Sequence, residues 1–194
     1  MSASPIARLV GRPIFWVVLI ASLVSWPIVR SARRTLAPAL PVLGTLSDFR
    51  LQDQSGRDYG SSELRGKIWV AGAISTACNA CSELTAAMGR IQHRARNLGA
   101  SFHLISLGVD PARDTAAALA EHGKRHRASP RMWSFLTGDR AVIEAVVAAG
   151  RLEGHHGRLA LIDPRMQIRG YYFAHQRDEI DRLLRDAGLV AARR

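Results

Sequence analysis

The chain has 194 residues, of which 47% are hydrophobic, so it can bury the core of one ordinary domain and carry a short appendage. Its net charge of +11 invites a nucleic-acid interpretation, but residues 1–40 hold five arginines and no acidic residue, so nearly half of the excess lies at the N-terminus. The other basic cluster, residues 122–131, lacks the interleaved aromatic residues and glycine-rich loops that nucleic-acid sites often use, and we expect no nucleic-acid partner.

The first predicted element is an apolar helix. Residues 13–29 are 17 uncharged residues between Arg12 and Arg30, with Trp16 and Trp26 near the two ends. As a helix this run would rise about 25 Å, near the lower limit for crossing a bilayer, and the tryptophans fall where an interfacial aromatic belt would place them. The pattern predicts a transmembrane helix in a membrane anchor over residues 1–30, in contact with the lipid bilayer.

A cleaved signal peptide is the alternative for this segment. The nearest A-x-A pattern, Ala37-Pro38-Ala39, is separated from the apolar run by Arg30, Arg33 and Arg34, which favours an uncleaved anchor. The short N-terminal tail favours translocation of the C-terminal domain. We therefore expect a single-pass protein of the inner or plasma membrane, with its soluble domain on the extracytoplasmic (periplasmic) side, where both cysteines meet an oxidising compartment.

The segment after the anchor predicts a tether and then the start of a domain. Residues 31–45 contain Pro38, Pro41 and Gly44 and are expected to lead away from the membrane. The predicted domain spans residues 46–194. It begins with a hairpin over 48–60, a helical turn over 61–67 and a buried central strand over 67–75.

The two cysteines of the chain, Cys78 and Cys81, come directly after this strand. A helix is predicted next, because Leu84, Met88, Ile91, Ala95 and Leu98 recur at helical spacing, with Gly99 as the stop. The pair is therefore expected on the first turn of a helix.

The remaining elements alternate between strands and helices. Strands are expected over 101–109 and 132–137, each followed by a helix, with Asp114 and Asp139 as the N-caps and Gly150 ending the second helix. Two further strands around a turn at 164–166 and an amphipathic helix on Ile180, Leu183, Leu184 and Ala187 close the chain. This order predicts an α/β fold with a thioredoxin-like mixed sheet and an N-terminal hairpin.

The position of the cysteine pair indicates activated thiols. A helix N-terminus carries unpaired N–H groups and a partial positive charge, which favour thiolate, the form needed both for disulfide exchange and for binding a soft metal. An inert pair is less favoured, because a disulfide across so short a loop adds little stability. The spacing alone leaves redox and metal chemistry both open.

A metal site needs a third ligand, and the chain has seven histidines. His93, His103, His122, His126 and His175 are each expected to be structural or solvated. His155 and His156 differ, because they stand in a loop before a predicted strand, and in a thioredoxin-like sheet that loop approaches the cysteine-bearing helix. Two sulfurs and one imidazole would form a three-coordinate site suited to Cu(I).

Several blocks in order resemble the Sco/SenC family of membrane-anchored copper-handling proteins involved in cytochrome c oxidase assembly. They are LRGKIWVAGAISTAC, SLGVDPARDT, WSFLTGD, HHGRLALIDP and IRGYY, and the similarity covers about residues 46–174. The resemblance implies a thioredoxin-like fold and a copper ion bound by Cys78, Cys81 and His155. Asp110 and Asp114 match an acidic D-x-x-x-D of the family, although a turn former and a helix cap are the simpler interpretation.

The cysteine motif departs from the family pattern C-P-x-x-C, since CNAC has two intervening residues and no proline. The leading hypothesis is a copper metallochaperone that acts on the copper-site subunit of a terminal oxidase. The alternative is an enzyme, a membrane-anchored thiol-disulfide oxidoreductase in which Cys78 attacks and Cys81 resolves.

Overall fold

The computed structural model describes residues 13–35, 39–77, 82–153 and 157–193. The chain divides into two compact units, Met1–Pro38 and Ala39–Arg194. In the first unit the predicted apolar helix is present as α2, Pro13–Thr35, and it extends past the predicted end of the anchor at residue 30. Large apolar side chains on α2 are exposed, among them Leu23 at 73% and Trp26 at 70%.

The predicted membrane span is corrected by the structure. No helix among the described residues is both long enough and apolar enough to cross a membrane. The apolar run does not stand alone as a helix, since α2 continues through Arg30, Arg33 and Arg34 to Thr35.

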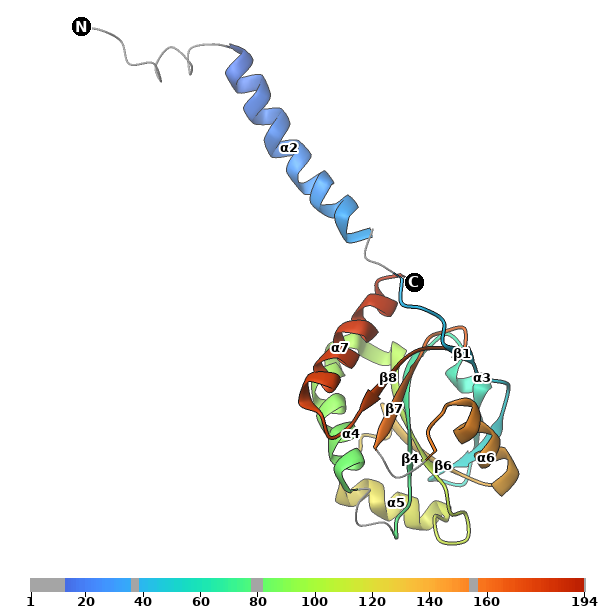
Figure 1. Ribbon diagram of the computed structural model, residues 1–194. Helices are drawn as coiled ribbons and strands as arrows, with labels where there is room; N and C mark the ends of the chain where they lie inside the picture. The colour runs from blue at the N-terminus through green and yellow to red at the C-terminus, as the bar shows by residue number, and fades with distance from the viewer. Residues whose placement is uncertain (1–12, 36–38, 78–81, 154–156, 194) are drawn as a thin grey trace, which may run out of the picture. The chain divides into compact units, whose positions relative to one another are not determined.

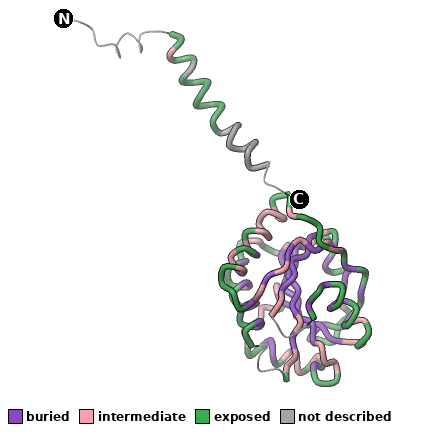
Figure 2. Tube along the Cα trace, in the orientation of Figure 1, coloured by how far each residue is buried: buried purple, intermediate pink, exposed green. Residues whose placement is uncertain are grey.

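An eight-stranded mixed sheet forms the centre of the second unit, in the order β1-β8-β7-β4-β5-β6-β2-β3 (Figure 1). β4, β5 and β6 are parallel, and the other strands run antiparallel to their neighbours. The central strands are almost entirely buried (Figure 2), as continuous apolar runs predict. The strands are β1 (Gly44–Thr45), β2 (Arg50–Asp53), β3 (Asp58–Gly60), β4 (Ile68–Ile74), β5 (Phe102–Gly108), β6 (Trp133–Thr137), β7 (Arg158–Ile162) and β8 (Gln167–Phe173).

Helices cover both faces of this sheet. One face carries α4 (Ser82–Arg94), α5 (Ala116–Arg125) and α7 (Arg177–Ala191), and the other carries α3 (Ser61–Leu64) and α6 (Arg140–Ala149). A short 3₁₀ helix, η2 (Ala95–Ser101), comes after α4. The predicted mixed α/β fold with an N-terminal hairpin is confirmed, and so are the predicted strands and helices within a few residues of their ends.

Two details of the helix ends differ from the prediction or refine it. Thr115, not Asp114, caps α5, because its hydroxyl accepts a hydrogen bond from the Ala118 backbone N–H. Asp139 caps α6 as predicted, through bonds from the Ala141 and Val142 N–H groups. The carboxylate of Asp114 is used elsewhere, at the end of β4.

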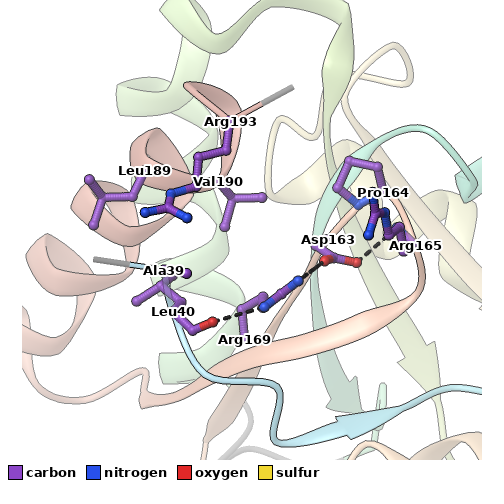
Figure 3. A pocket seen from close by; sticks show the side chains of 9 residues that line it. All are labelled: Ala39, Leu40, Asp163, Pro164, Arg165, Arg169, Leu189, Val190 and Arg193. Atoms are coloured by element: carbon purple, nitrogen blue, oxygen red, sulfur yellow. Dashed lines mark hydrogen bonds and ion pairs between the residues drawn. The ribbon is translucent and has the colours of Figure 1, made fainter. Parts of the chain in front are cut away.

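Residues just before β1 are already tied to the sheet. The Leu40 carbonyl accepts a hydrogen bond from the Arg169 guanidinium at 2.8 Å, and Arg169 also pairs with Asp163 at 2.7 Å (Figure 3). The Leu43 N–H then bonds to the Ile168 carbonyl, and β1 pairs with β8. Residues 40–45, which lie in the predicted tether, therefore make ordered contacts with β8.

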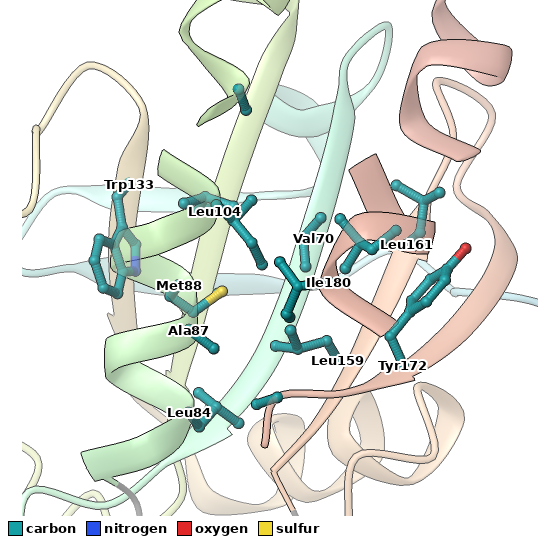
Figure 4. Close-up of a cluster of buried hydrophobic side chains, with 14 of the residues drawn as sticks. Val70, Leu84, Ala87, Met88, Leu104, Trp133, Leu159, Leu161, Tyr172 and Ile180 are labelled. Atoms are coloured by element: carbon teal, nitrogen blue, oxygen red, sulfur yellow. The ribbon is translucent and has the colours of Figure 1, made fainter. Parts of the chain in front are cut away.

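The larger core fixes α4 against the sheet. Leu84, Ala87, Met88 and Ile91 of α4 pack over Val70, Leu104 and Leu159, and Ile180 of α7 joins the same cluster (Figure 4). Each of these side chains is at most 4% exposed, and each large one contributes about 1.5–3 kcal/mol by leaving water. The helix after the cysteine pair is thereby fixed in direction and position.

Candidate metal and thiol site

The predicted site residues Cys78, Cys81 and His155 fall in segments 78–81 and 154–156, outside the described residues. His156 lies there too. Their neighbours along the chain are described: β4 ends at Ile74, α4 begins at Ser82, and Gly157 leads into β7. These flanking residues define where the cysteine and histidine segments leave the fold.

The two flanks belong to neighbouring strands. β4 and β7 are antiparallel, with Gly72 opposite Leu159. Continuing this register by two residues sets Gly157 opposite Ile74. Adjacent strands lie about 4.8 Å apart, so the chain leaves β4 towards the cysteines at the edge of the sheet where it enters β7 from the histidine loop.

The segment between β4 and the cysteines is held by Asp114. One carboxylate oxygen of Asp114 accepts hydrogen bonds from the Thr76 N–H at 2.8 Å and from the Thr76 hydroxyl at 2.6 Å. The other accepts the Asp110 N–H at 3.0 Å. The residue is 0% exposed. Because Thr76 stands two residues before Cys78, Asp114 fixes the backbone from which the cysteine segment departs.

Gly108 makes room for this carboxylate. A Cβ atom at Gly108 would lie 2.7 Å from the Asp114 Cβ, closer than non-bonded carbons approach. The last residue of β5 must therefore lack a side chain if Asp114 is to reach Thr76. The Val109 N–H also bonds to the Ile74 carbonyl, which closes the ends of β4 and β5 together.

Arginines balance the acidic charge on this edge. Asp110 is 35% exposed in its side chain and lies 3.7 Å from the Arg113 guanidinium and 3.5 Å from that of Arg140. Its charge is therefore offset, and we assign Asp110 to the loop structure.

A buried histidine lies under the first turns of α4. The Nε2 atom of His122 is 3.3 Å from the Thr85 hydroxyl, and Thr85 comes four residues after Cys81 in the sequence. His122 is 8% exposed, and the His126 ring lies 4.5 Å away, centroid to centroid. Burial, and next the electrostatic influence of His126 and Arg125, lower the pKa of His122 to about 4, so the His122 ring is neutral at physiological pH.

The sequence places His122 in the basic cluster of residues 122–131 and predicts a structural or solvated role for it. Lys124, Arg125 and Arg127 are not buried, but His122 is. The burial of His122 could have been predicted from its spacing. His122 comes three residues after the buried Leu119 and therefore lies on the same inward face of α5.

His175 is a further histidine at the site's edge of the sheet. It comes after β8, its ring lies 5.7 Å from that of Phe173, and it is exposed. Phe173 pairs with Arg158 at the start of β7, and the Ala174 N–H bonds to the Gly157 carbonyl. Within the described ranges, no group of three His, Cys, Asp or Glu side chains is arranged to hold a metal ion.

The flanks favour activated thiols at this edge. Cys81 directly precedes the first residue of α4, a 13-residue helix whose N-terminal N–H groups favour a nearby thiolate. Two thiolates with a neutral imidazole would form a donor set for a soft cation. The same two thiols without the imidazole would suffice for disulfide exchange.

Known proteins share this sequence pattern. The sequence model of the family described as SCO1/SenC matches residues 43–186. The SCO1 protein homolog of Bacillus subtilis (strain 168) is 30% identical over 99 residues, which are 50% of this chain and 51% of the relative. The chain thus spans about half the length of the curated relative that it matches.

Solved structures with the same fold are also found. BsSco, a member of the Sco family of cytochrome c oxidase assembly proteins, has a TM-score of 0.70 at 23% identity, covering 79% of this chain and 97% of that one. Arabidopsis thaliana ScoI with copper bound has a TM-score of 0.60 at 24% identity, covering 75% and 96%. At these identities the likeness shows the fold, which is the thioredoxin-like mixed sheet predicted from the sequence.

Proposed function

The chain belongs to the SCO1/SenC family, and from that premise we propose that it is a copper metallochaperone that serves the copper-site subunit of a terminal oxidase. Cys78, Cys81 and His155 hold the ion, and the two cysteines must be reduced to do so. The domain that carries them is residues 46–194, preceded by the N-terminal segment and its tether.

The observation that carries the proposal is the pairing of β4 with β7. It brings the chain that leaves β4 before residues 78–81 to the same edge of the sheet as the chain that enters β7 after residues 154–156. Asp114 steadies the first of these flanks through Thr76, and the Gly157 carbonyl steadies the second through the Ala174 N–H. Ligating side chains that are carried by two chain segments fixed at the same edge of the sheet can bind one ion.

The donor set suits Cu(I). Thiolates are soft ligands that select monovalent copper, and one neutral imidazole completes a three-coordinate site that leaves the ion accessible for transfer. The structure of Arabidopsis thaliana ScoI with copper bound supports copper as the cargo. The place of BsSco among the cytochrome c oxidase assembly proteins supports an oxidase as the partner.

A competition titration tests the proposal. The full chain in detergent micelles is reduced and titrated anaerobically with Cu(I) against a chromophoric chelator. We expect one ion per chain and an affinity at least tenfold weaker in His155→Ala. His175→Ala is the matched control, because it removes an exposed imidazole from the same edge, and its affinity should stay within twofold of the wild type. Equal weakening in both variants, or none in His155→Ala, contradicts the proposed ligand set.

The second candidate function is thiol-disulfide exchange, which the two-residue spacing of CNAC favours. In this reaction the Cys78 thiolate attacks one sulfur of a partner disulfide and releases the other as a thiolate. Cys81 then attacks the Cys78 sulfur, which frees the reduced partner and leaves a disulfide in this chain. A cellular dithiol would have to reduce that disulfide before the next cycle. Rapid reduction of insulin disulfides together with His155-independent Cu(I) binding would favour this candidate over the chaperone.

We also propose that the protein associates with the extracytoplasmic face of the inner or plasma membrane through α2. The exposed apolar side chains of α2 support this, since burying each one in lipid is favourable by about 1.5–3 kcal/mol.

A further inference from the structure

The edge of the sheet opposite the flanks of the cysteine and histidine segments is where the chain enters the domain. There Ala39 and Leu40 line a cavity of about 380 Å³, and the Leu40 carbonyl is bonded to Arg169 (Figure 3). The turn between β7 and β8 and the end of α7 complete the cavity walls. Because β4 crosses the sheet in seven residues, the two edges are roughly 20 Å apart.

Five exposed arginines stand at this opposite edge, which we call the basic edge. They belong to the segments that precede β5 and β6, to the turn after β7 and to the residues after α7. The five are Arg96, Arg127, Arg131, Arg165 and Arg193, and the last two line the cavity. Within the described ranges, none of the five has an ion pair.

The packing holds these segments together at the basic edge. Apolar neighbours of the arginines pack against the larger core cluster, among them Leu40, Leu98, Met132 and Val190. The Gln92 side chain near the end of α4 also bonds to the 126–132 loop, through the Arg127 carbonyl at 3.1 Å and the Ser129 N–H at 2.7 Å. The arginines are therefore carried by backbone that is fixed to the fold.

The acidic charge at the basic edge is already used. Segments 95–101, 126–132, 163–167 and 191–193 contain one acidic residue, Asp163. Its side chain is 5% exposed and pairs with Arg169 at 2.7 Å. The same carboxylate accepts the Arg165 and Gln167 backbone N–H groups at 2.8 and 2.9 Å. The charge that this edge presents to a partner is therefore positive.

The chain connection indicates which anionic partner lies within reach. Residues 36–38 join α2 to Ala39, and this link can span no more than about 14 Å. The sequence of α2 ends with Arg30, Arg33 and Arg34, a cluster of the kind that anionic lipid headgroups attract. A membrane-bound α2 therefore keeps the basic edge within reach of a lipid surface.

We propose that the basic edge rests on the anionic surface of a phospholipid bilayer, with the phosphate of one lipid in the cavity beside Arg165 and Arg193. This inference rests on the proposed association of α2 with the membrane. The edge that leads to the cysteine and histidine segments then faces away from the lipid, roughly 20 Å from the basic edge. A partner would meet the proposed copper site on that side.

Modification of individual arginines tests this orientation. The full chain is placed in nanodiscs of phosphatidylcholine, with or without phosphatidylglycerol, and treated with p-hydroxyphenylglyoxal, and the modification of each arginine is followed by mass spectrometry. Phosphatidylglycerol should slow the modification of Arg165 and Arg193 at least fivefold. Arg151 and Arg177 are exposed arginines at the cysteine edge, and their rates should stay within twofold. High salt should abolish the protection, because it screens exposed charges.

Two double variants then assign the protection to the basic edge. Arg165→Gln with Arg193→Gln should reduce the phosphatidylglycerol-dependent protection of Arg96 at least threefold. Arg151→Gln with Arg177→Gln removes the same charge from the opposite edge and should leave that protection within twofold. Circular dichroism and thermal unfolding confirm that each variant is folded.

The outcomes separate this proposal from the membrane association of α2. A chain that enters neutral nanodiscs but shows equal arginine modification in both lipids would overturn the orientation and leave the role of α2 standing. Equal losses in the two double variants, or protection of Arg151 and Arg177 instead, would also overturn the orientation. A chain that enters neither kind of nanodisc would overturn both proposals.

Discussion

Single buried residues set the backbone around the proposed copper site. Asp114 is fully buried and accepts three hydrogen bonds, two of them from Thr76. His122 is buried against the Thr85 hydroxyl on the helix that comes after Cys81. Neither is a proposed ligand. Both residues stabilise the elements that adjoin the segments with the proposed ligands. Their substitution should therefore lower the stability of the fold first, and weaken metal binding only by displacing the ligands.

Asp114→Asn should lower the free energy of unfolding by about 2 kcal/mol, because the amide loses charge-assisted bonds and turns an N–H₂ group towards buried donors. It should also weaken Cu(I) binding, since Thr76 is released. Urea unfolding and the chelator titration measure the two effects. Asp58→Asn removes an exposed carboxylate that pairs with Arg50 and should change either quantity little. An Asp114→Asn protein as stable as Asp58→Asn would refute the role given to Asp114.

His122 should make stability depend on pH. Its folded pKa of about 4 lies below the 6.5 of the unfolded chain, so unfolding takes up a proton. This part of the stability is present above pH 6.5 and is lost as the pH falls towards 4. Between pH 7 and 4.5 the wild type should lose on the order of 2 kcal/mol more than His122→Gln, measured by urea unfolding. Parallel curves for the two proteins would contradict the assignment.

At the scale of elements, the ends of β4 and β5 form one unit. Gly108 ends β5 beneath Asp114, and Asp114 in turn accepts two hydrogen bonds from Thr76, two residues after the end of β4. The strands and helices themselves were predictable, because their apolar spacing is local. The role of Asp114 was not, since Thr76 lies 38 residues away in the sequence and Asp114 and Thr115 are both residue types that are favoured as helix caps. β1 was missed for a similar reason, because its two residues are defined by pairing with β8.

A pair of glycine substitutions tests this unit. Gly108→Ala places a Cβ 2.7 Å from that of Asp114 and should cost about 1–3 kcal/mol through the clash. Gly89→Ala, inside α4, meets nothing within 4 Å and should stabilise the protein by up to about 1 kcal/mol through helix propensity. Chemical denaturation gives both values. Similar effects of the same sign at the two positions would count against the packing described.

At the scale of the whole molecule, the sequence predicted the mixed sheet and the family but left the chemistry open. The pattern of strands and helices identifies the fold because each element has its own apolar period. It cannot distinguish copper from disulfide chemistry, since both need the same activated thiols at a helix start. The predicted membrane span was not supported, because no helix among the described residues is both long enough and apolar enough to cross a membrane.

Lipid association of α2 is a property of the whole chain. The full protein should float with vesicles of phosphatidylcholine and phosphatidylglycerol in a density gradient. Leu23→Ser with Trp26→Ser removes two large exposed apolar side chains from α2 and should reduce the bound fraction at least tenfold. Val42→Ser with Leu43→Ser, which alters exposed apolar residues outside α2, should not. Equal losses in the two double variants would exclude α2 as the contact.

The most direct test of the proposed site is X-ray absorption spectroscopy of the full chain loaded with one Cu(I) under anaerobic conditions. We predict two sulfur ligands and one nitrogen ligand, with the nitrogen lost in His155→Ala and retained in His175→Ala. A site with sulfur ligands alone in the wild type, or a nitrogen ligand that survives in His155→Ala, would contradict the assignment of Cys78, Cys81 and His155.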